Sequence, residues 1–236
     1  MTSRAATGRA RAQAMVSGAQ RTQYTFGVVL ALILASLTFQ VAAPETEWAR
    51  FTILTLHGLV LLSGLFAARA HPALISFALA AVGVSLLVSA FALIGPGEVS
   101  EVPAAIVNLM FVGLTPIIVA RGLVREIREE RTVTFRTITG VLCIYLLIGI
   151  FFAFVYGVID SFDDAAFFPR VDEASTSDFL YFSFTTLTTT GYGDLVTADE
   201  LGRSMAVTEA LVGQIYLVTV VALIVSNFRP PTRRNA

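Results

Sequence analysis

The chain has 236 residues, of which 56% are hydrophobic and only 14% are charged, and its formal net charge is -1. A soluble domain of this size carries about 25% charged residues, so the composition excludes an ordinary cytosolic enzyme and a disordered chain. The near-neutral charge argues against a nucleic-acid-binding protein. The single cysteine, Cys143, excludes an internal disulfide and a multi-cysteine metal site. We therefore expect an all-α membrane protein.

Six stretches meet or nearly meet the requirement of about 20 apolar residues for a helix that crosses a bilayer. In chain order they are Tyr24–Ala43, Phe51–Ala68, Ala73–Ile94, Pro103–Arg121, Thr137–Ile159 and Ser204–Phe228. The first can also be read as a signal peptide, because arginines precede it and Val41-Ala42-Ala43 resembles a cleavage site. Its apolar run is longer than that of a typical signal peptide, which favours a retained helix.

The distribution of arginine predicts the orientation in the membrane. If the N-terminus is cytoplasmic, 13 of the 16 basic residues lie inside, and only Arg50, Arg170 and Arg203 lie outside. Both termini are then cytoplasmic, and the connection between the fifth and sixth spans faces the exterior. The absence of lysine and the compact chain suggest a prokaryotic inner (plasma) membrane.

The first four spans, residues 23–121, are predicted to form a four-helix domain without voltage-sensor charges. A voltage sensor needs several arginines within one helix, because each charge gains only about 2.3 kcal/mol per 100 mV. No basic residue lies between Pro103 and Ala120, so we expect no strong voltage sensing. His57, in the second span, is interpreted as a structural histidine, with a proton sensor as the alternative.

Charged residues of both signs follow the fourth span. Residues 122–136 are predicted to form a solvated cytoplasmic linker helix along the membrane, because glutamates there lie within helical reach of arginines. The Ala- and Arg-rich residues 1–22 are predicted to be a disordered cytoplasmic segment that contacts anionic lipid. Residues 229–236 are predicted to be a short cytoplasmic tail, so we expect intracellular ligand gating to require a separate regulatory subunit.

The external connection between the fifth and sixth spans contains an apolar segment of about half a span. Ser175–Asp194 is too polar and too short to cross the bilayer. Ser175 or Ser177 can cap the start of a helix, and Asp178 suits the positive end of the helix dipole. A half-helix that continues into irregular backbone is tolerated at membrane depth only beside a protein-enclosed, water-filled cavity.

The end of this segment, Thr189-Thr190-Gly191-Tyr192-Gly193-Asp194, resembles the selectivity filter of tetrameric potassium channels. The resemblance implies that backbone carbonyls replace the hydration shell of K⁺. It implies K⁺ binding by Thr189, Thr190, Gly191 and Tyr192, with the Thr189 hydroxyl as the innermost ligand and no cofactor besides the permeant ion. Carbonyls that all face inward require alternating left-handed backbone conformations, which explains Gly191 and Gly193.

The same resemblance implies supporting contacts behind the filter. Tyr192 packs outward against the pore helix, Asp194 hydrogen-bonds back toward it, to Tyr181, and Thr185 supports the filter from within that helix. Thr190 stands where the family commonly has Val or Ile. Its additional hydroxyl needs a partner, and this departure concerns filter stability and inactivation more than selectivity.

The sixth span adds two candidate residues. Gly213 lies where channels of this family have a glycine hinge, and close helix packing is an equally supported alternative. Glu209 is an intramembrane carboxylate and therefore a functional candidate. We expect it to bond the back of the pore helix, at a threonine hydroxyl, and to tune gating; a structural, protonated carboxyl is the alternative.

One chain supplies one filter strand, whereas a ring of carbonyls needs four, so residues 137–228 are expected to be the pore domain of a homotetramer. The predicted function is a potassium-selective channel subunit that conducts K⁺ passively within membrane lipid, without enzymatic activity. A weakly selective cation channel, a non-conducting modulatory membrane subunit and a membrane-embedded enzyme are the alternatives. Tension, pH, lipid and constitutive leak all stay open as gating modes.

Overall fold

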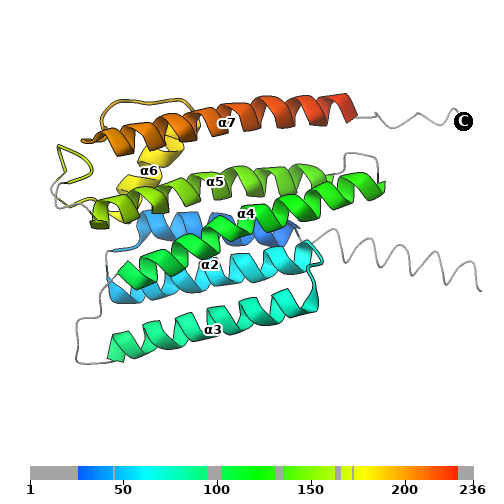
Figure 1. Ribbon diagram of the computed structural model, residues 1–236, viewed down its shortest axis with the longest axis horizontal. Helices are drawn as coiled ribbons and strands as arrows, with labels where there is room; N and C mark the ends of the chain where they lie inside the picture. Colours follow the sequence, from blue (N-terminus) through cyan, green and yellow to red (C-terminus); the bar gives the residue numbers. More distant parts are fainter. Residues whose placement is uncertain are drawn as a thin grey trace, which may run out of the picture.

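The computed structural model describes residues 26–44, 46–94, 102–130, 135–162, 166–171 and 173–227. Within these residues the chain forms seven α-helices and no strand, which confirms the predicted all-α class (Figure 1). After an N-terminal helix, Phe26–Ala42, come α2 (Glu47–Ala67), α3 (Pro72–Ile94), α4 (Val102–Glu130), α5 (Phe135–Phe162), α6 (Thr176–Leu187) and α7 (Glu200–Asn227). The predicted N-terminal segment, 1–22, and the tail, 229–236, lie outside the described residues.

Four of the described helices are long and apolar enough to cross a membrane. They are α2, α5 and the greater part of α3 and α4, with spanning segments Glu47–Ala67, Phe135–Phe162, Pro72–Ala90 and Ile106–Arg128. The N-terminal helix is apolar but shorter over its described residues, and α7 is not among these four helices. Four of the six predicted spans are therefore confirmed as capable of crossing, and the first and sixth stay predictions.

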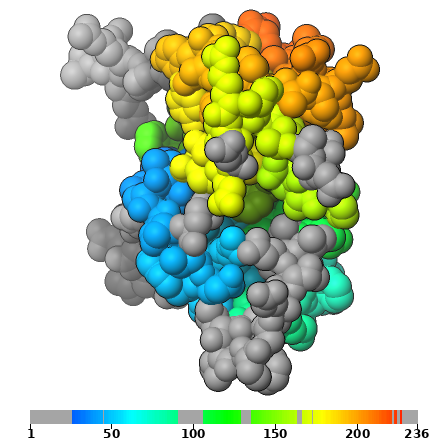
Figure 2. Space-filling view, turned by 90° about the vertical axis from the view of Figure 1, so that its left-hand side faces the viewer, coloured from blue at the N-terminus to red at the C-terminus, as the bar shows by residue number. Residues whose placement is uncertain are grey.

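The long helices run side by side, and α5 lies at the centre of the arrangement (Figure 1). It packs against α4 on one side and against α6 and α7 on the other, while α2 packs against α3 and α4. Viewed from one end, the segments after α5 occupy one half of the molecule, and the N-terminal helix and α2 occupy the other (Figure 2). The outer faces of many helices are apolar, as expected for a protein surrounded by lipid.

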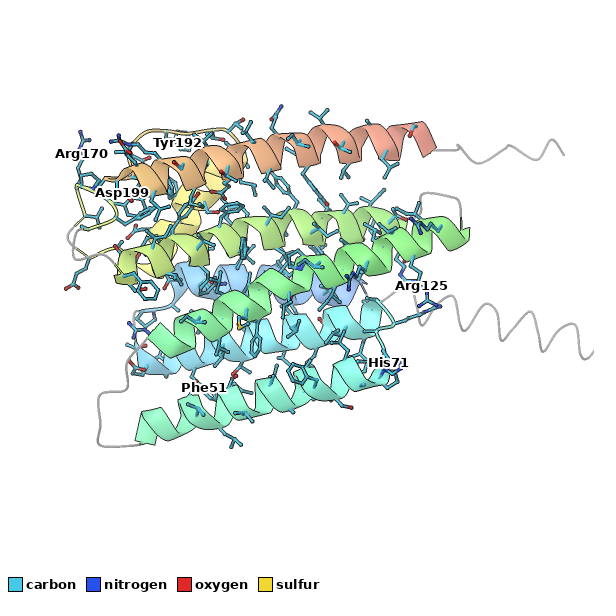
Figure 3. The ribbon with its side chains drawn as sticks, viewed as in Figure 1. Phe51, His71, Arg125, Arg170, Tyr192 and Asp199 are labelled. Atoms are coloured by element: carbon cyan, nitrogen blue, oxygen red, sulfur yellow. The ribbon has the colours of Figure 1, made fainter. Side chains whose placement is uncertain are left out.

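The two ends of the bundle carry the residues that the sequence assigns to opposite sides of the membrane. Tyr192, Asp199 and Arg170 lie at one end, whereas Arg125 and His71 lie at the other (Figure 3). Because α6 and the start of α7 are at the first end, that end corresponds to the predicted exterior.

The predicted linker helix over 122–136 is not a separate element. Residues 122–130 instead form the last turns of α4, and α5 begins at Phe135. Glu126 is buried rather than solvated, with its carboxylate 3.1 Å from Nε of Arg136. The Arg136 guanidinium also lies 4.9 Å from the centre of the Phe26 ring and donates to the Ala67 carbonyl at 3.5 Å. One side chain of α5 therefore contacts the N-terminal helix, α2 and α4.

An aromatic cluster holds the start of α6 against the end of α5. Phe167 and Phe168, from the connecting segment, pack edge-on at 4.9 Å between ring centres. Both contact Phe182 of α6, and Phe167 also contacts Tyr156 of α5. Such aromatic pairs add stability beyond the apolar area that they bury, so the position of α6 is fixed by packing as well as by its connections.

Candidate functional site

The short helix α6 begins with a capping box. The Ser175 side chain accepts a hydrogen bond from the Asp178 N–H at 3.2 Å, and the Asp178 carboxylate accepts one from the Ser175 N–H at 2.9 Å. Of the two candidate caps, Ser175 is the one used, and the Ser177 hydroxyl lies 2.9 Å from it. The carboxylate also lies where the helix dipole is positive, so local sequence defines where α6 starts.

The backbone after α6 alternates between left-handed and ordinary conformations. Thr189 has φ 56°, Gly191 has φ 49° and Gly193 has φ 80°, whereas Thr190 and Tyr192 have no positive φ. The two glycines adopt the conformation expected of them. The left-handed conformation of Thr189 is not expected from the sequence, because it costs a residue with a Cβ atom about 1–2 kcal/mol. This alternation is what a row of carbonyls facing one side requires.

Hydrogen bonds from α6 hold this backbone in place. The Thr185 carbonyl accepts the N–H of Thr190 at 2.8 Å and that of Gly191 at 3.1 Å, and the Thr189 N–H donates to the Thr186 carbonyl at 2.9 Å. The Thr185 hydroxyl turns back to the Phe182 carbonyl at 3.0 Å. Thr185 therefore contacts the predicted filter through its main chain and not through its side chain.

The hydroxyl of Thr190, where the related pattern has Val or Ile, has a partner. Its Oγ1 lies 2.9 Å from Oγ1 of Thr188, and the Thr188 hydroxyl donates to the Phe184 carbonyl at 2.7 Å. Because Thr188 has one proton, which it gives to Phe184, Thr190 is the donor in the contact between the two threonines. Sequence reasoning missed Thr188, which carries no motif signal of its own.

Tyr181 connects the middle of α6 to the residues after Gly191. Its hydroxyl donates to the Asp194 carboxylate at 2.8 Å, the contact expected for Asp194, and its ring stacks on that of Tyr192 with 6.4 Å between centres. The hydrogen bond from Tyr181 lowers the pKa of the Asp194 carboxyl below its ordinary value. Tyr192 is nevertheless 73% exposed in the single chain, so a large part of this surface is open to another molecule.

Gly213 lies where α7 passes the end of α6. A Cβ atom built on it would overlap the Leu187 carbonyl oxygen and lie 2.8 Å from Cδ1 of the same residue. α7 continues as an unbroken helix through this position. Close packing, one of the two alternatives, therefore explains the glycine in this conformation, and the hinge stays a prediction.

Glu209 lies one turn before Gly213, and its side chain is fully buried. Tyr156 Oη donates to its Oε2 at 2.6 Å, and the hydroxyl of Ser183 contacts its Oε1. The expected bond to the back of α6 is present, but the partner is a serine and not a threonine. Ser183 and Tyr156 are the two residues that sequence reasoning missed here.

His57 belongs to a separate buried cluster in the four-helix part. Its Nδ1 lies 3.1 Å from the Asn108 side-chain oxygen, its Nε2 lies 3.5 Å from the Gln40 amide nitrogen, and its ring packs edge-on against Phe154 at 5.2 Å. These contacts favour the structural interpretation. Within the described parts of the chain, no three His, Cys, Asp or Glu side chains converge as a metal site would require.

Residues 140–229 match a protein-family model described as an ion channel. The matched part runs from the first turns of α5 through α6 and the predicted filter to the end of α7. Neither a curated protein nor a solved structure matches the chain. The match supports an ion channel domain in this part of the chain, and with the apolar helices it supports a membrane protein in ion transport.

Proposed function

We propose that this protein is a potassium-selective channel subunit and that four copies form one pore. The observation that carries the proposal is the alternation of left-handed conformations at Thr189, Gly191 and Gly193, directly after the half-buried short helix α6. Stacked rings of carbonyl oxygens replace the hydration shell of K⁺. In the proposed pore, Thr189, Thr190, Gly191 and Tyr192 provide these ligands.

A tetramer is the simplest assembly that completes the site. The segment from Thr189 to Asp194 is exposed in the single chain, although ion-binding carbonyls need to be shielded from bulk water. α7 also exposes a stripe of large apolar side chains at helical spacing: Val207, Leu211, Ile215 and Val218. We propose that neighbouring subunits cover this segment and part of this stripe.

The membrane arrangement of the proposed channel follows the charges. Asp194, Asp199 and Glu200 lie near the filter end and would raise the local cation concentration there. The spanning part of α4 holds no basic residue between Ile106 and Ala120, so the proposed channel is not strongly voltage-gated. We propose that six helices span, with both termini on the cytoplasmic side of a prokaryotic inner (plasma) membrane.

Reversal potentials in planar bilayers test the proposed selectivity. With K⁺ on one side and Na⁺ on the other, the full-length protein should give a reversal potential close to that of K⁺. A value near zero would instead favour a weakly selective cation channel. Gly191→Ala should abolish selectivity, since alanine is strained at φ 49°, whereas Gly83→Ala, at a position with no neighbouring atom within 4 Å, should not. Selectivity that survives Gly191→Ala would contradict the filter assignment.

A further inference from the structure

Glu209, Ser183 and Tyr156 form a buried polar cluster where α7, α6 and α5 meet. All three residues have 0% exposure. Tyr156 donates to Oε2 of Glu209, while the Ser183 hydroxyl contacts both Oε1 of Glu209 and, at 2.7 Å, the carbonyl oxygen of Gly149. Three helices therefore share one small hydrogen-bond network.

The number of protons available for hydrogen bonds in this network indicates the protonation state of the Glu209 carboxyl group. The Ser183 hydroxyl has one proton but contacts two oxygen atoms, and the Gly149 carbonyl has no proton to give. If Glu209 were ionised, Ser183 could satisfy only one contact, and the other would bring two acceptors together. If Glu209 carries a proton on Oε1, it donates to Ser183, Ser183 donates to Gly149, and each close contact is a hydrogen bond.

The surroundings of Glu209 agree with a neutral acid. A buried carboxylate normally requires a paired cation, because removing a charge from water costs several kcal/mol. Within the described residues, the ion pairs join Arg50 to Glu47 and Arg136 to Glu126, and none involves Glu209. Its hydrogen-bond partners are the neutral hydroxyls of Tyr156 from α5 and Ser183 from α6, and the further titratable side chain of α5 that interacts with it, Tyr145, is also a neutral hydroxyl.

The cluster lies directly behind the proposed filter. Ser183 is two residues before Thr185, whose carbonyl holds the N–H groups of Thr190 and Gly191. Glu209 and Gly213 are one turn apart on α7, and both contact α6, at Ser183 and Leu187. The network and the close packing at Gly213 therefore fix the same short helix from one side.

We propose that Glu209 is a neutral carboxylic acid with its proton on Oε1, and that this proton links α7 to α6 and positions the filter. Glu209 is thus a positioning residue that acts through Ser183 and contacts no ion. The effect on the filter depends on the proposed channel function, whereas the protonation state does not. The two parts are tested by separate measurements.

Infrared spectroscopy of the full-length protein in lipid tests the protonation state. A protonated carboxylic acid has a C=O stretching band that a carboxylate lacks. At neutral pH, the difference spectrum between wild type and Glu209→Gln should show the loss of this band, whereas Glu200→Gln, at an exposed position on the same helix, should not change it. Ser183→Ala should shift the band, because the acid loses its acceptor. A difference spectrum that shows the loss of carboxylate bands overturns the proposal.

Selectivity measurements test the positioning role. Glutamine preserves the pattern, because its amide N–H can donate to Ser183 and its oxygen can accept from Tyr156. Glu209→Gln should therefore restore the K⁺ over Na⁺ selectivity that Glu209→Ala lowers by about tenfold, as expected for two lost buried hydrogen bonds. If glutamine is as harmful as alanine, the charge of Glu209 is required and the proposal is wrong. If Glu209→Ala does not assemble, the selectivity of Glu209→Gln is compared with that of wild type: equal values support the proposal, and a marked loss contradicts it.

Discussion

The Tyr181 hydroxyl donates to the Asp194 carboxylate at 2.8 Å, and this single contact joins the middle of α6 to the residue that follows Gly193. Both residues belong to the same chain, so the loop after the half-helix is held before any second subunit is added. The parallel stacking of Tyr181 and Tyr192, 8° between ring planes, reinforces the same connection. In the proposed channel, this pair stabilises the outer end of the filter.

Removing this hydrogen bond should shorten the time that the filter conducts. Tyr181→Phe leaves the ring stacked on Tyr192 but removes the donor to Asp194, and Asp194→Asn weakens the acceptor. We expect each variant to inactivate several-fold faster in single-channel recordings. The double variant should be no worse than the more affected single variant, because both remove one interaction; additive effects would contradict the coupling.

The lowered pKa of Asp194 predicts that the proposed filter resists mild external acidification. The hydrogen bond from Tyr181 places the pKa of Asp194 below its ordinary value of 3.8. A lowered pKa means that the stabilising contribution is complete above the ordinary pKa and is lost as the pH falls through the lowered one. External acidification to about pH 5 should therefore leave filter stability unchanged in wild type. A marked loss between pH 5 and 6 that Asp194→Asn removes would contradict this assignment.

Substitution of Gly213 separates close packing from a hinge. In Gly213→Ala, the new methyl group would overlap the Leu187 carbonyl, and such overpacking costs about 1–3 kcal/mol. We expect the proposed tetramer to dissociate at a clearly lower temperature. Gly83→Ala is the matched control, because no atom lies within 4 Å of the added Cβ. If Gly213→Ala instead keeps full thermal stability and changes only the open probability, the hinge interpretation is correct.

The two threonine hydroxyls behind the proposed filter should tolerate substitution unequally. In Thr190→Val, Thr188 keeps its hydrogen bond to the Phe184 carbonyl, so no polar group loses its only partner. In Thr188→Val, the Thr190 hydroxyl loses its partner, which is the more costly change when the site is covered by neighbouring subunits. Recordings of inactivation should show Thr188→Val more impaired than Thr190→Val. The reverse order would contradict the hydrogen-bond assignment.

The features that the sequence predicts well depend on residues that are close together along the chain. A serine cap at the start of α6, Asp178 in its first turn, and the left-handed conformations of Gly191 and Gly193 follow from local rules and are present. The spans that consist of long apolar runs are also well predicted, and four are confirmed over the described residues.

The features that the sequence does not reveal depend on how helices face one another. α6 offers the Ser183, Thr185 and Thr188 hydroxyls, and only its rotation against α7 decides that Ser183 meets Glu209. That rotation is set by packing, since the Phe184 ring fills the space left by Gly149 of α5, where a Cβ would lie 2.8 Å from the ring. Residues 122–136 carry charges of both signs, which favours a solvated helix, yet Glu126 is buried and pairs with Arg136 of α5.

The central claim is tested most directly by ion flux from liposomes that contain the purified, full-length protein. Liposomes loaded with K⁺ and diluted into a K⁺-free medium that contains a protonophore, so that inward H⁺ flow balances the charge, should release K⁺ down its gradient. Matched liposomes loaded with Na⁺ should release almost none. The size of the assembly is measured in the same preparation, so that dissociated protein is not mistaken for an intact tetramer that does not conduct. Intact tetramers that release no K⁺, or that release Na⁺ as fast as K⁺, would contradict a potassium-selective pore.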